Sequence, residues 1–590
     1  MPTSVKWHSL SLSVPACKRP ARQLPVPRPC VSMATQYDPL AGCWRGPDRP
    51  PVLNPAANLG QVLLNVLERA GPKPAQLNGD TGYVMSGDEL RRRSVRFARR
   101  LIGPDRCQQG DVVALMARNS DDVAPVVLGC FLAGVTVSTL DPSFGVEEVE
   151  HLLRLTRPRN VIADADALPV VYEAAGRIGL LLAAQQYVLL GEPSAQCLPV
   201  ADVTTVETDD EDGFVPAYRG DSTTLTAVIV CSSGTTGLPK AVRISHAQLI
   251  GPYQRVSQLD RRDTILCFST LYWISGWQML MTGLLNGIRR VITTRPATPQ
   301  LAIELCNRHQ VTLLLVTPTM ATDIVRTLEA SAERLPSIKL FAVGGSTVSK
   351  RLREDINQRV LVAGRGRSLV GYGTSETGNI AYELLVRDDS VGFLLPGVTA
   401  KITAEDGRPL GPNETGELLV RPAHPFLGYH GDVPATEATL AADGYVRTGD
   451  IARFDADGYL YLVDRKREIF KYDGFQIAPT ELEDTIAELP GVRYVAVVGL
   501  PDPARPYNEL ATALVVREPY ESASAPTGRQ VVEHCARTPD GRARPAHKWL
   551  RGGVIFVDQL PMTASGKVRR AVAKQLAASL WNPSGPHSSG

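Results

Sequence analysis

The 590-residue chain lacks the features that mark several common classes of protein. Its 63 basic and 61 acidic residues leave a formal net charge of +2, whereas a dedicated nucleic-acid-binding protein usually carries a strong basic excess. No segment approaches the roughly 20 consecutive apolar residues of a membrane-spanning helix, so we predict no integral membrane segment. The ten cysteines form no CxxC pair and have no regular spacing, which indicates isolated thiols in a reducing compartment. The length allows more than one domain.

Two widespread catalytic signatures are also missing. The chain contains neither the GxSxG turn of a serine hydrolase nor a GxxxxGK[ST] phosphate loop. Ser245 and His246 are adjacent, but a helix N-cap explains them more simply than catalysis does. His534 and Cys535 are adjacent as well, and they lack the further ligands that zinc requires. We therefore expect neither serine-hydrolase nor zinc chemistry.

The two ends of the chain differ in composition from the rest. Residues 1–37 contain five basic residues and no acidic one, which faintly resembles a mitochondrial transit peptide. Five prolines between positions 15 and 29 would interrupt an amphipathic helix, so we predict a disordered extension ahead of an internal start at Met33. Residues 579–590 are predicted to be a disordered tail without a peroxisomal SKL-type end. We expect a cytoplasmic protein, with the mitochondrion as the alternative.

From about residue 55 to 460, apolar strands alternate with helix-like segments. This alternation predicts an α/β fold in which helices cover both faces of parallel sheets. Ligands then collect beyond the carboxyl ends of the strands. The pattern changes to a small α+β unit after DRKRE. We predict a large N-terminal domain over residues 38–463 and a small C-terminal domain over residues 464–578.

The segment CSSGTTGLPKAV, residues 231–242, directly follows the apolar strand LTAVIV. Small hydroxyl residues and glycines are poor core material, but they wrap backbone N–H groups and hydroxyl donors around an anion. The segment therefore predicts a mobile clamp over a polyphosphate, and a polar surface turn is the alternative. The candidate ligands are Ser232, Ser233, Gly234, Thr235, Thr236, Gly237 and Lys240.

Three further stretches place polar residues near strand ends. In GYGTSETG, Glu376 could hold Mg²⁺ on nucleotide phosphates and Tyr372 offers a flat face to a base. Asp450 could accept hydrogen bonds from ribose hydroxyls, and Arg465 could contact ribose or phosphate. In PMTASGKVRR, Lys567 lies on a turn of small residues before the last helix. Taken singly, each is also explained as an ordinary exposed charge.

Together, and in this order, the four stretches resemble the adenylate-forming superfamily of acyl-CoA synthetases, 4-coumarate–CoA ligases and beetle luciferases over roughly residues 37–578. YDPLAGCWRGP and YWISG resemble insect 4-coumarate–CoA ligase-like proteins. The resemblance implies an ATP-dependent acid–CoA ligase with Mg²⁺, whose partners are a carboxylic acid (aryl, or medium to long acyl) and coenzyme A. It also implies that the C-terminal domain is mobile. The oligomeric state stays open.

The resemblance also assigns roles to individual residues. The 232–240 loop would hold the β- and γ-phosphates, Glu376 would hold Mg²⁺, and Lys567 would serve the adenylation step, in which a fixed cation offsets charge on the α-phosphate. The remaining nucleotide contacts would be Gly371, Tyr372, Gly373, Thr374, Asp450 and Arg465. The acyl pocket would be built from Trp273, Ser275, Gly276, Thr317, Gly344, Gly345 and Ser346.

The second half-reaction would use other residues of the C-terminal domain. Lys471, as a catalytic residue, and Gly474 would move toward the acyl-adenylate and CoA after a rotation at Arg467, a position that usually holds Lys or Asp. Ala241 stands where the family usually has glycine.

Two other functions compete with the ligase. One is a luciferase-like oxygenase working through the same adenylate, although beetle luciferases commonly have HHGFG where this chain has YWISG. The other is a non-catalytic member that binds nucleotide. Trp273 is either a wall of the acyl pocket or an ordinary core residue.

Overall fold

The computed structural model describes most of the chain. The described ranges are 34–48, 54, 57–102, 107–180, 182–191, 197–207, 211–217, 220–232, 239–251, 259–331, 333–383, 387, 389–518, 525–538, 541–563 and 567–581.

Regular structure extends slightly into both of the terminal segments that were predicted to be disordered. The first strand, β1 (Gln36–Asp38), pairs with β2 (Cys43–Arg45), so regular structure begins inside the predicted extension. The last helix, α15 (Arg570–Leu580), runs two residues into the predicted tail. The indole N–H of Trp581 donates to the Gly552 carbonyl at 2.9 Å and fastens that end. Residues 1–33, including Met33, and residues 582–590 lie outside the described part.

The first sheet has seven strands in the order β11-β10-β6-β5-β7-β8-β9, and all neighbours are parallel except β10 and β11. Its strands are β5 (Val112–Met116), β6 (Thr136–Leu140), β7 (Asn160–Asp164), β8 (Tyr187–Leu190), β9 (Leu198–Pro199), β10 (Thr226–Ser232) and β11 (Lys240–Ser245). Its helices are α2 (Gly87–Leu101), α3 (Val123–Leu132), α4 (Val146–Thr156), α5 (Leu168–Arg177), α6 (Val200–Thr204) and α7 (His246–Ile250).

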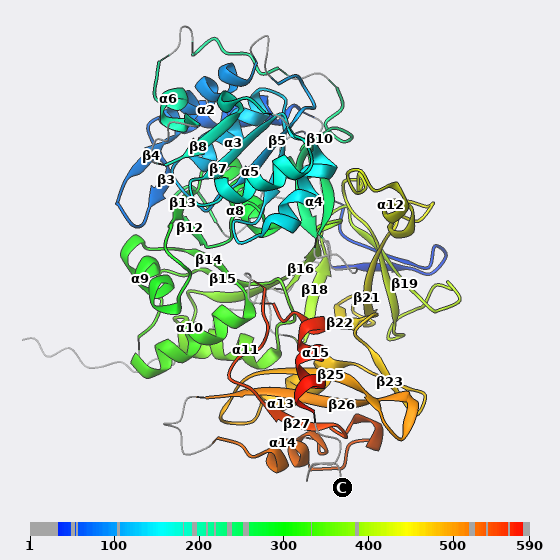
Figure 1. The fold of residues 1–590 in the computed structure, drawn as a ribbon. Coiled ribbons are helices and arrows are strands. Elements are labelled where there is room, and N and C mark those ends of the chain that lie inside the picture. The colour runs from blue at the N-terminus through cyan, green and yellow to red at the C-terminus, as the bar shows by residue number, and fades with distance from the viewer. Residues whose placement is uncertain are drawn as a thin grey trace, which may run out of the picture.

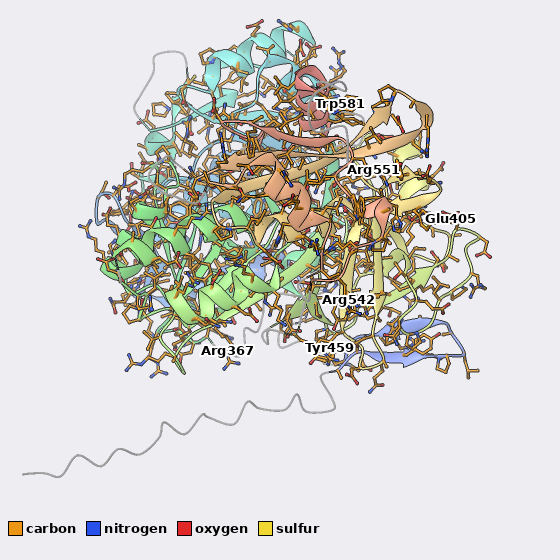
Figure 2. All side chains as sticks on the ribbon, turned by 90° about the horizontal axis from the view of Figure 1, so that it is seen from below. Arg367, Glu405, Tyr459, Arg542, Arg551 and Trp581 are labelled. Atoms are coloured by element: carbon orange, nitrogen blue, oxygen red, sulfur yellow. The ribbon has the colours of Figure 1, made fainter. Side chains whose placement is uncertain are left out.

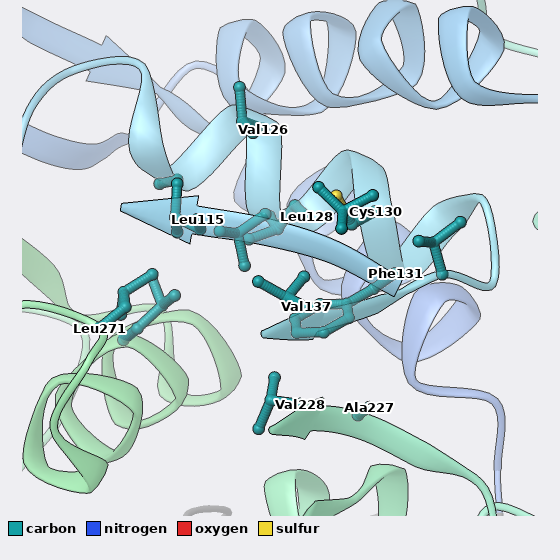
Figure 3. Packing of buried hydrophobic residues seen from close by; sticks show 14 of the residues in the cluster. Leu115, Val126, Leu128, Cys130, Phe131, Val137, Ala227, Val228 and Leu271 are labelled. Atoms are coloured by element: carbon teal, nitrogen blue, oxygen red, sulfur yellow. The ribbon is translucent and has the colours of Figure 1, made fainter. Parts of the chain in front are cut away.

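The continuous apolar strands of this sheet follow from its two covered faces. Val113 and Leu115 of β5 pack into the cluster that contains α2 and α3, while Ala114 and Met116 pack into the cluster that contains α4 and α5. Figure 3 shows Leu115 on the side of the sheet where Phe131 of α3 packs. Because successive side chains point to opposite faces, both faces of the strand are apolar.

The second sheet has fifteen strands in the order β1-β2-β19-β20-β21-β22-β18-β17-β16-β15-β14-β12-β13-β3-β4. Its remaining strands up to residue 374 are β3 (Pro74–Asn78), β4 (Val84–Ser86), β12 (Thr264–Cys267), β13 (Arg289–Ile292), β14 (Leu313–Val316), β15 (Leu340–Val343) and β16 (Arg367–Thr374). The later ones are β17 (Gly378–Glu383), β18 (Ser390–Leu394), β19 (Thr399–Thr403), β20 (Gly416–Arg421), β21 (Val446–Phe454) and β22 (Leu460–Arg465).

Helices cover the parallel part of this sheet, as the alternation predicted. They are α8 (Ile274–Asn286), α9 (Pro299–His309), α10 (Pro318–Ser331) and α11 (Lys350–Asp355), with α12 (Val433–Thr439) beyond them. Helix α1 (Leu59–Ala70) packs instead against α2, α3 and α8. From β16 to β22 the strands are antiparallel to their neighbours, so the predicted strand–helix alternation up to residue 460 is wrong after β16. Hairpin turns replace crossover helices there, because antiparallel strands need no crossover.

The C-terminal domain is the predicted α+β unit. Its elements are β23 (Phe470–Tyr472), β24 (Phe475–Ile477), α13 (Pro479–Ala487), β25 (Val492–Asp502), β26 (Arg505–Arg517), α14 (Gly528–Cys535), β27 (Gly553–Phe556) and α15. Helix α14, which Thr527 caps, was not predicted because it is short and lies between two Pro- and Gly-rich loops.

The fold class is confirmed: a large N-terminal domain of helices and sheets carries a smaller α+β domain below it (Figure 1). Figure 2, seen from below, shows the C-terminal domain with Arg551 and Trp581 in front of the large domain. Short single-turn segments complete the structure at Ala184–Gln186, Ile356–Val360 and Ala546–Lys548. None of the helices in the described ranges combines the length and apolar character that crossing a bilayer requires.

Trp44 anchors the N-terminal hairpin to the antiparallel part of the second sheet. Its side chain is 1% exposed, stacks on Phe454 with ring centroids 4.5 Å apart, and contacts the ring of Tyr37 at 4.7 Å. Because Phe454 ends β21, this contact ties the start of the chain to the strand that carries Asp450.

We expect Trp44→Ala to lose about 3 to 5 kcal/mol of stability, because it deletes a large buried side chain and leaves a cavity. Thermal unfolding followed by circular dichroism measures the loss. Leu40→Ala is the control, since Leu40 is fully exposed in the same hairpin and its loss should cost less than about 0.5 kcal/mol. Equal unfolding midpoints for the two variants would contradict this account.

Candidate functional site

The predicted phosphate clamp is the connection of an antiparallel hairpin. Ser232, the last residue of β10, pairs in register with Lys240, the first residue of β11. Ser233, Gly234, Thr235, Thr236 and Gly237 lie outside the described residues. The side chain of Ala241 is 1% exposed and packs with Val112 and Ile229. Its methyl group therefore fills the core beside the hairpin.

Ser245 and His246 are structural, as predicted. Ser245 accepts from the Gln248 backbone N–H at 3.1 Å and so caps α7. His246 is 3% exposed, and burial lowers its pKa to about 4.

A tyrosine links the hairpin to the predicted magnesium ligand. The Lys240 ammonium lies 4.8 Å from the centroid of the Tyr429 ring, and the Tyr429 hydroxyl donates to Glu376 Oε1 at 2.9 Å. The backbone of Tyr429 bridges to Val242 of β11, and its N–H donates to Thr436 Oγ1 at 2.9 Å. Burial, followed by the charge of Glu376, raises the pKa of Tyr429. Sequence reasoning missed Tyr429 because it is far from Lys240 and Glu376 in the chain.

Glu376 lies in the turn of the β16–β17 hairpin. Gly371, Tyr372, Gly373 and Thr374 belong to β16 and extend the strand, so their prediction as a loop is wrong. The extension needs glycine, because a Cβ on Gly373 would lie 2.3 Å from a backbone oxygen of the paired strand. The hairpin thereby holds Glu376 at the carboxyl end of the parallel strands, where ligands were expected.

Asp450 is buried between two partners from different strands. It is 5% exposed, accepts the Tyr372 hydroxyl at 2.5 Å on Oδ2, and pairs with Arg465 Nε at 2.7 Å on Oδ1. Burial raises the pKa of Asp450, and the charge of Arg465 opposes that shift. Burial also raises the pKa of Tyr372 well above its usual value. A tyrosine donor and a guanidinium thus fix the orientation of the carboxylate while leaving it free lone pairs.

Lys567 reaches the large domain from the C-terminal domain. A Cβ built on Gly345 would lie 3.4 Å from Lys567 Cε, so the lysine side chain passes over the glycine that follows β15. Burial, then the positive charge of Arg465, lowers the pKa of Lys567, and the negative charge of Asp450 opposes this. In Figure 1 the red segment before α15 rises from the small domain toward β15 and β16. The structure therefore brings Lys567, Gly345, Arg465 and Asp450 together.

The residues predicted for the acyl pocket fall into two groups. Gly344, Gly345 and Ser346 follow β15 beside Lys567. Thr317 lies between the neighbouring strand β14 and helix α10. Trp273, Ser275 and Gly276 form the start of α8. A Cβ on Gly276 would lie 2.2 Å from the Thr270 carbonyl oxygen, so only glycine fits there.

Trp273 also serves as a core residue. Its ring meets Tyr272 edge-on at 4.8 Å and packs against the buried cluster of α4 and α5. The cavity next to it is lined by residues that were not predicted. They include Ile244, Leu249, Ile274, Gly378, Asn379 and His424.

The residues predicted for the second half-reaction lie elsewhere in the small domain. Lys471 is exposed on β23, and Gly474, with φ +80°, forms the turn to β24. Arg505 Nη1 forms an ion pair with Asp473 Oδ1 of this turn at 2.8 Å. No contact joins Lys471 to Asp450 or Lys567 among the described residues. Arg467 is exposed and lies 3.9 Å from Glu468.

Ion pairs fix the start of α15, the helix that follows Lys567, within the small domain. At the start of α15, Arg570 pairs with Glu468 of the linker at 2.6 Å and with Glu483 of α13 at 2.6 Å. Across the domain boundary, the Tyr494 hydroxyl donates to Asp323 of α10 at 2.8 Å.

Comparison with known proteins identifies the family of the chain. The profile of the AMP-binding enzyme family matches residues 65–430, and that of the AMP-binding enzyme C-terminal domain matches residues 481–567. The chain belongs to the AMP-binding enzyme family, and thus to the adenylate-forming superfamily.

Similar proteins within the family carry the names of different enzymes. The chain is 31% identical to 4-coumarate–CoA ligase-like 6 of Oryza sativa subsp. japonica, over 86% of this chain and 85% of that protein. It is 26% identical to luciferin 4-monooxygenase of Photuris pensylvanica, over 80% of this chain and 86% of that protein. Among solved structures, the anthranilate CoA ligase AuaEII in complex with anthranoyl-AMP matches with a TM-score of 0.77 at 22% identity. The match covers 90% of this chain and 99% of that one. The likeness to insect members stays a prediction.

We expect Tyr429→Phe to weaken Mg·ATP binding by about tenfold, because it removes one hydrogen bond to a charged group, worth about 1.5 kcal/mol, and keeps the ring beneath Lys240. Tyr429→Leu should weaken binding further, since the cation–π contact is lost as well. Isothermal titration calorimetry with and without Mg²⁺ measures both. Equal affinities for wild type and Tyr429→Phe would show that the hydroxyl does not position Glu376.

Proposed function

We propose that the protein is an ATP-dependent acid–CoA ligase that converts an aryl or a medium- to long-chain carboxylic acid to acyl-AMP and then to acyl-CoA. One observation carries the proposal: Lys567 of the small domain lies over Gly345 of the large domain, near the buried Asp450 and its partner Arg465. We divide the chain accordingly into an N-terminal domain over 38–463 and a C-terminal domain over 464–578.

In the first step, a carboxylate oxygen of the acid attacks the α-phosphorus of ATP, and the bond to the pyrophosphate oxygen breaks. Asp450 binds the ribose hydroxyls, and the charge of Arg465 favours the ionised form of that carboxylate. The Lys567 ammonium lies where charge develops on the α-phosphate, so it stabilises the transition state more than the bound substrates. Lys240 and the hydroxyls of its hairpin hold the outgoing phosphates.

The residues present also fit a magnesium ion. Mg²⁺ prefers one or two carboxylates together with phosphate oxygens, and Glu376, held by Tyr429 on the same side as Lys240, supplies one carboxylate. When bound, the ion would neutralise phosphate charge. The described residues contain no cluster of three or more His, Cys, Asp or Glu side chains that would hold a metal by themselves.

In the second step, the CoA thiolate attacks the acyl carbon and AMP leaves. The exposed hairpin with Lys471 and Gly474 would have to replace Lys567 at the adenylate, which requires the small domain to turn at Arg467. The domain contacts are consistent with such a turn, because they include polar contacts such as the part-buried Tyr494–Asp323 bond, and polar interfaces between domains allow relative motion. Separating the two half-reactions in this way is a conformational-step mechanism.

A luciferase-like oxygenase is the second candidate, and the similarity to the Photuris luciferin 4-monooxygenase favours it. Both candidates share the adenylate, so a test must follow its fate. A non-catalytic nucleotide-binding protein is less consistent with a chain that keeps Lys567, Glu376 and Lys240.

We expect acid-dependent pyrophosphate release from Mg·ATP with at least one member of a panel of fatty, cinnamic-type and benzoic acids and luciferin. Lys567→Ala should lower that release about 100-fold, as the loss of one charge-stabilising donor does. Lys471→Ala should spare acyl-AMP formation and reduce acyl-CoA formation. Lys574→Ala, which breaks only a surface pair with Glu509, is the control.

Release that persists unchanged in Lys567→Ala would contradict the catalytic assignment. Light emission with luciferin, without CoA transfer to any acid, would favour the oxygenase. If no acid on the panel causes release, ATP-binding calorimetry on the same protein identifies the nucleotide-binding alternative.

The pKa of Lys567 predicts the alkaline limit of the first step. A lysine whose pKa is lowered loses its proton as the pH rises through a value below the usual 10.5. Adenylation should therefore start to decline with rising pH before pH 10.5 is reached. Lys567→Arg should remove this decline, since guanidinium stays charged to pH 12 and above. The rate of pyrophosphate release between pH 7 and 10.5 measures this. If the rate declined at the same pH in the wild type and in Lys567→Arg, the decline would belong to a titrating group other than Lys567.

A further inference from the structure

A tyrosine of the small domain binds a carboxylate of helix α10 in the large domain. The Tyr494 hydroxyl lies 2.9 Å from Asp323 Oδ1 and 2.8 Å from Oδ2, so it contacts both carboxylate oxygens. Arg493 Nη2 lies 3.4 Å from Oδ1 of the same carboxylate. Burial, followed by the hydrogen bond to Asp323, raises the pKa of Tyr494 to about 12, so the hydroxyl stays a donor at neutral pH. Bonds to a charged acceptor are stronger than neutral ones.

A second contact lies one turn further along α10. Arg326 Nη2 pairs with Glu518 Oε1 at 2.7 Å and donates to the Val492 carbonyl oxygen at 3.1 Å. Val492 starts β25 and Glu518 follows β26, so both lie at the same end of this strand pair as Tyr494. Asp323 and Arg326 are three residues apart and share one face of the helix. That face of α10 therefore docks one end of the small domain's main sheet.

Tyr494 is also packed into the part of the small domain that carries Lys567. Its ring, Met562 and Val568 all pack against one buried apolar cluster formed by β25, β26 and α15. Met562 and Val568 pair as an antiparallel bridge on either side of the Lys567 turn. Inside that turn, the Lys567 N–H donates to Thr563 Oγ1 at 3.1 Å. Because a packed cluster transmits displacement, a force on the Tyr494 ring reaches the Lys567 turn.

We propose that Tyr494 and Asp323 form a latch that positions Lys567 for adenylation and takes no part in the transfer to CoA. The hydroxyl fastens the small domain to α10, and the ring couples that contact to the turn of Lys567. Lys567 must leave before the CoA step, so the latch must open between the two half-reactions. The effect on adenylation rests on the proposed function, whereas the docking contact does not.

Tyr494→Phe tests the latch, because it removes the hydroxyl and keeps the packed ring. We expect acid-dependent pyrophosphate release to fall about fivefold, since fewer molecules hold Lys567 in place while Arg326 still docks the domain. Transfer from prepared acyl-AMP to CoA should be unchanged or faster, whereas a structural defect would slow both half-reactions. Asp323→Ala should show the same pattern. Adding Tyr494→Phe to it should change nothing further, because both remove one bond.

A second readout does not need ligase activity. Lys567 is partly buried against Gly345 of the large domain, so an amine-acetylating reagent modifies it mainly when the small domain is released. Mass spectrometry of the protein without ligands gives the acetylation rate of Lys567 relative to the exposed Lys574 of α15. We expect this ratio to rise about fivefold in Tyr494→Phe, in step with the loss of pyrophosphate release.

Tyr83→Phe is the matched control. The Tyr83 hydroxyl donates to Glu89 of α2, far from the small domain, so this variant loses a tyrosine–carboxylate bond without affecting the domain boundary (Figure 1). Both half-reactions and the acetylation ratio should keep their wild-type values. An unchanged ratio in Tyr494→Phe, or equal losses in both half-reactions, would overturn the latch. If the wild type releases no pyrophosphate with any acid, the ligase proposal fails, and the acetylation ratio alone decides the latch.

Discussion

The buried carboxylate of Asp450 is the interaction on which the site depends. It joins three strands, since Tyr372 comes from β16, Asp450 from β21 and Arg465 from β22. These strands belong to the parallel and antiparallel parts of one sheet. A buried carboxylate is stable only when its hydrogen bonds and charge are matched, so the pair and the tyrosine hold the two parts in one register.

Further charged side chains lie around Asp450 and beyond it. Arg465 faces Asp450 on one side and lies near Lys567 on another, and its charge is part of what lowers the pKa of that lysine. A second set of contacting residues lies at the start of β11, where Tyr429 contacts both Glu376 and Lys240. In the proposed function, the sugar of a nucleoside triphosphate would lie at Asp450 and its phosphates at Lys240.

Several features could be read from local sequence, and others could not. The apolar runs and the small-residue loops identified the α/β fold and the residues Lys240, Glu376, Asp450 and Lys567, because each sits in a recognisable stretch. The antiparallel strands after β16 were missed, since a hairpin and a crossover can follow similar apolar strands. Tyr429 was missed because its partners are 189 and 53 positions away, and no local pattern records such a contact.

What the sequence alone determined was the family and the kinds of residue that act, because glycine, hydroxyl and lysine patterns follow local backbone requirements. Only the tertiary structure decided which of them meet. Lys567 precedes α15 and Lys471 lies on strand β23 of the same small domain, yet only Lys567 lies over Gly345. Contacts across the domain boundary, such as the Tyr494–Asp323 bond, set the position of that domain. Charges act over short distances in a protein, so their proximity in space, which the fold sets, decides their chemistry.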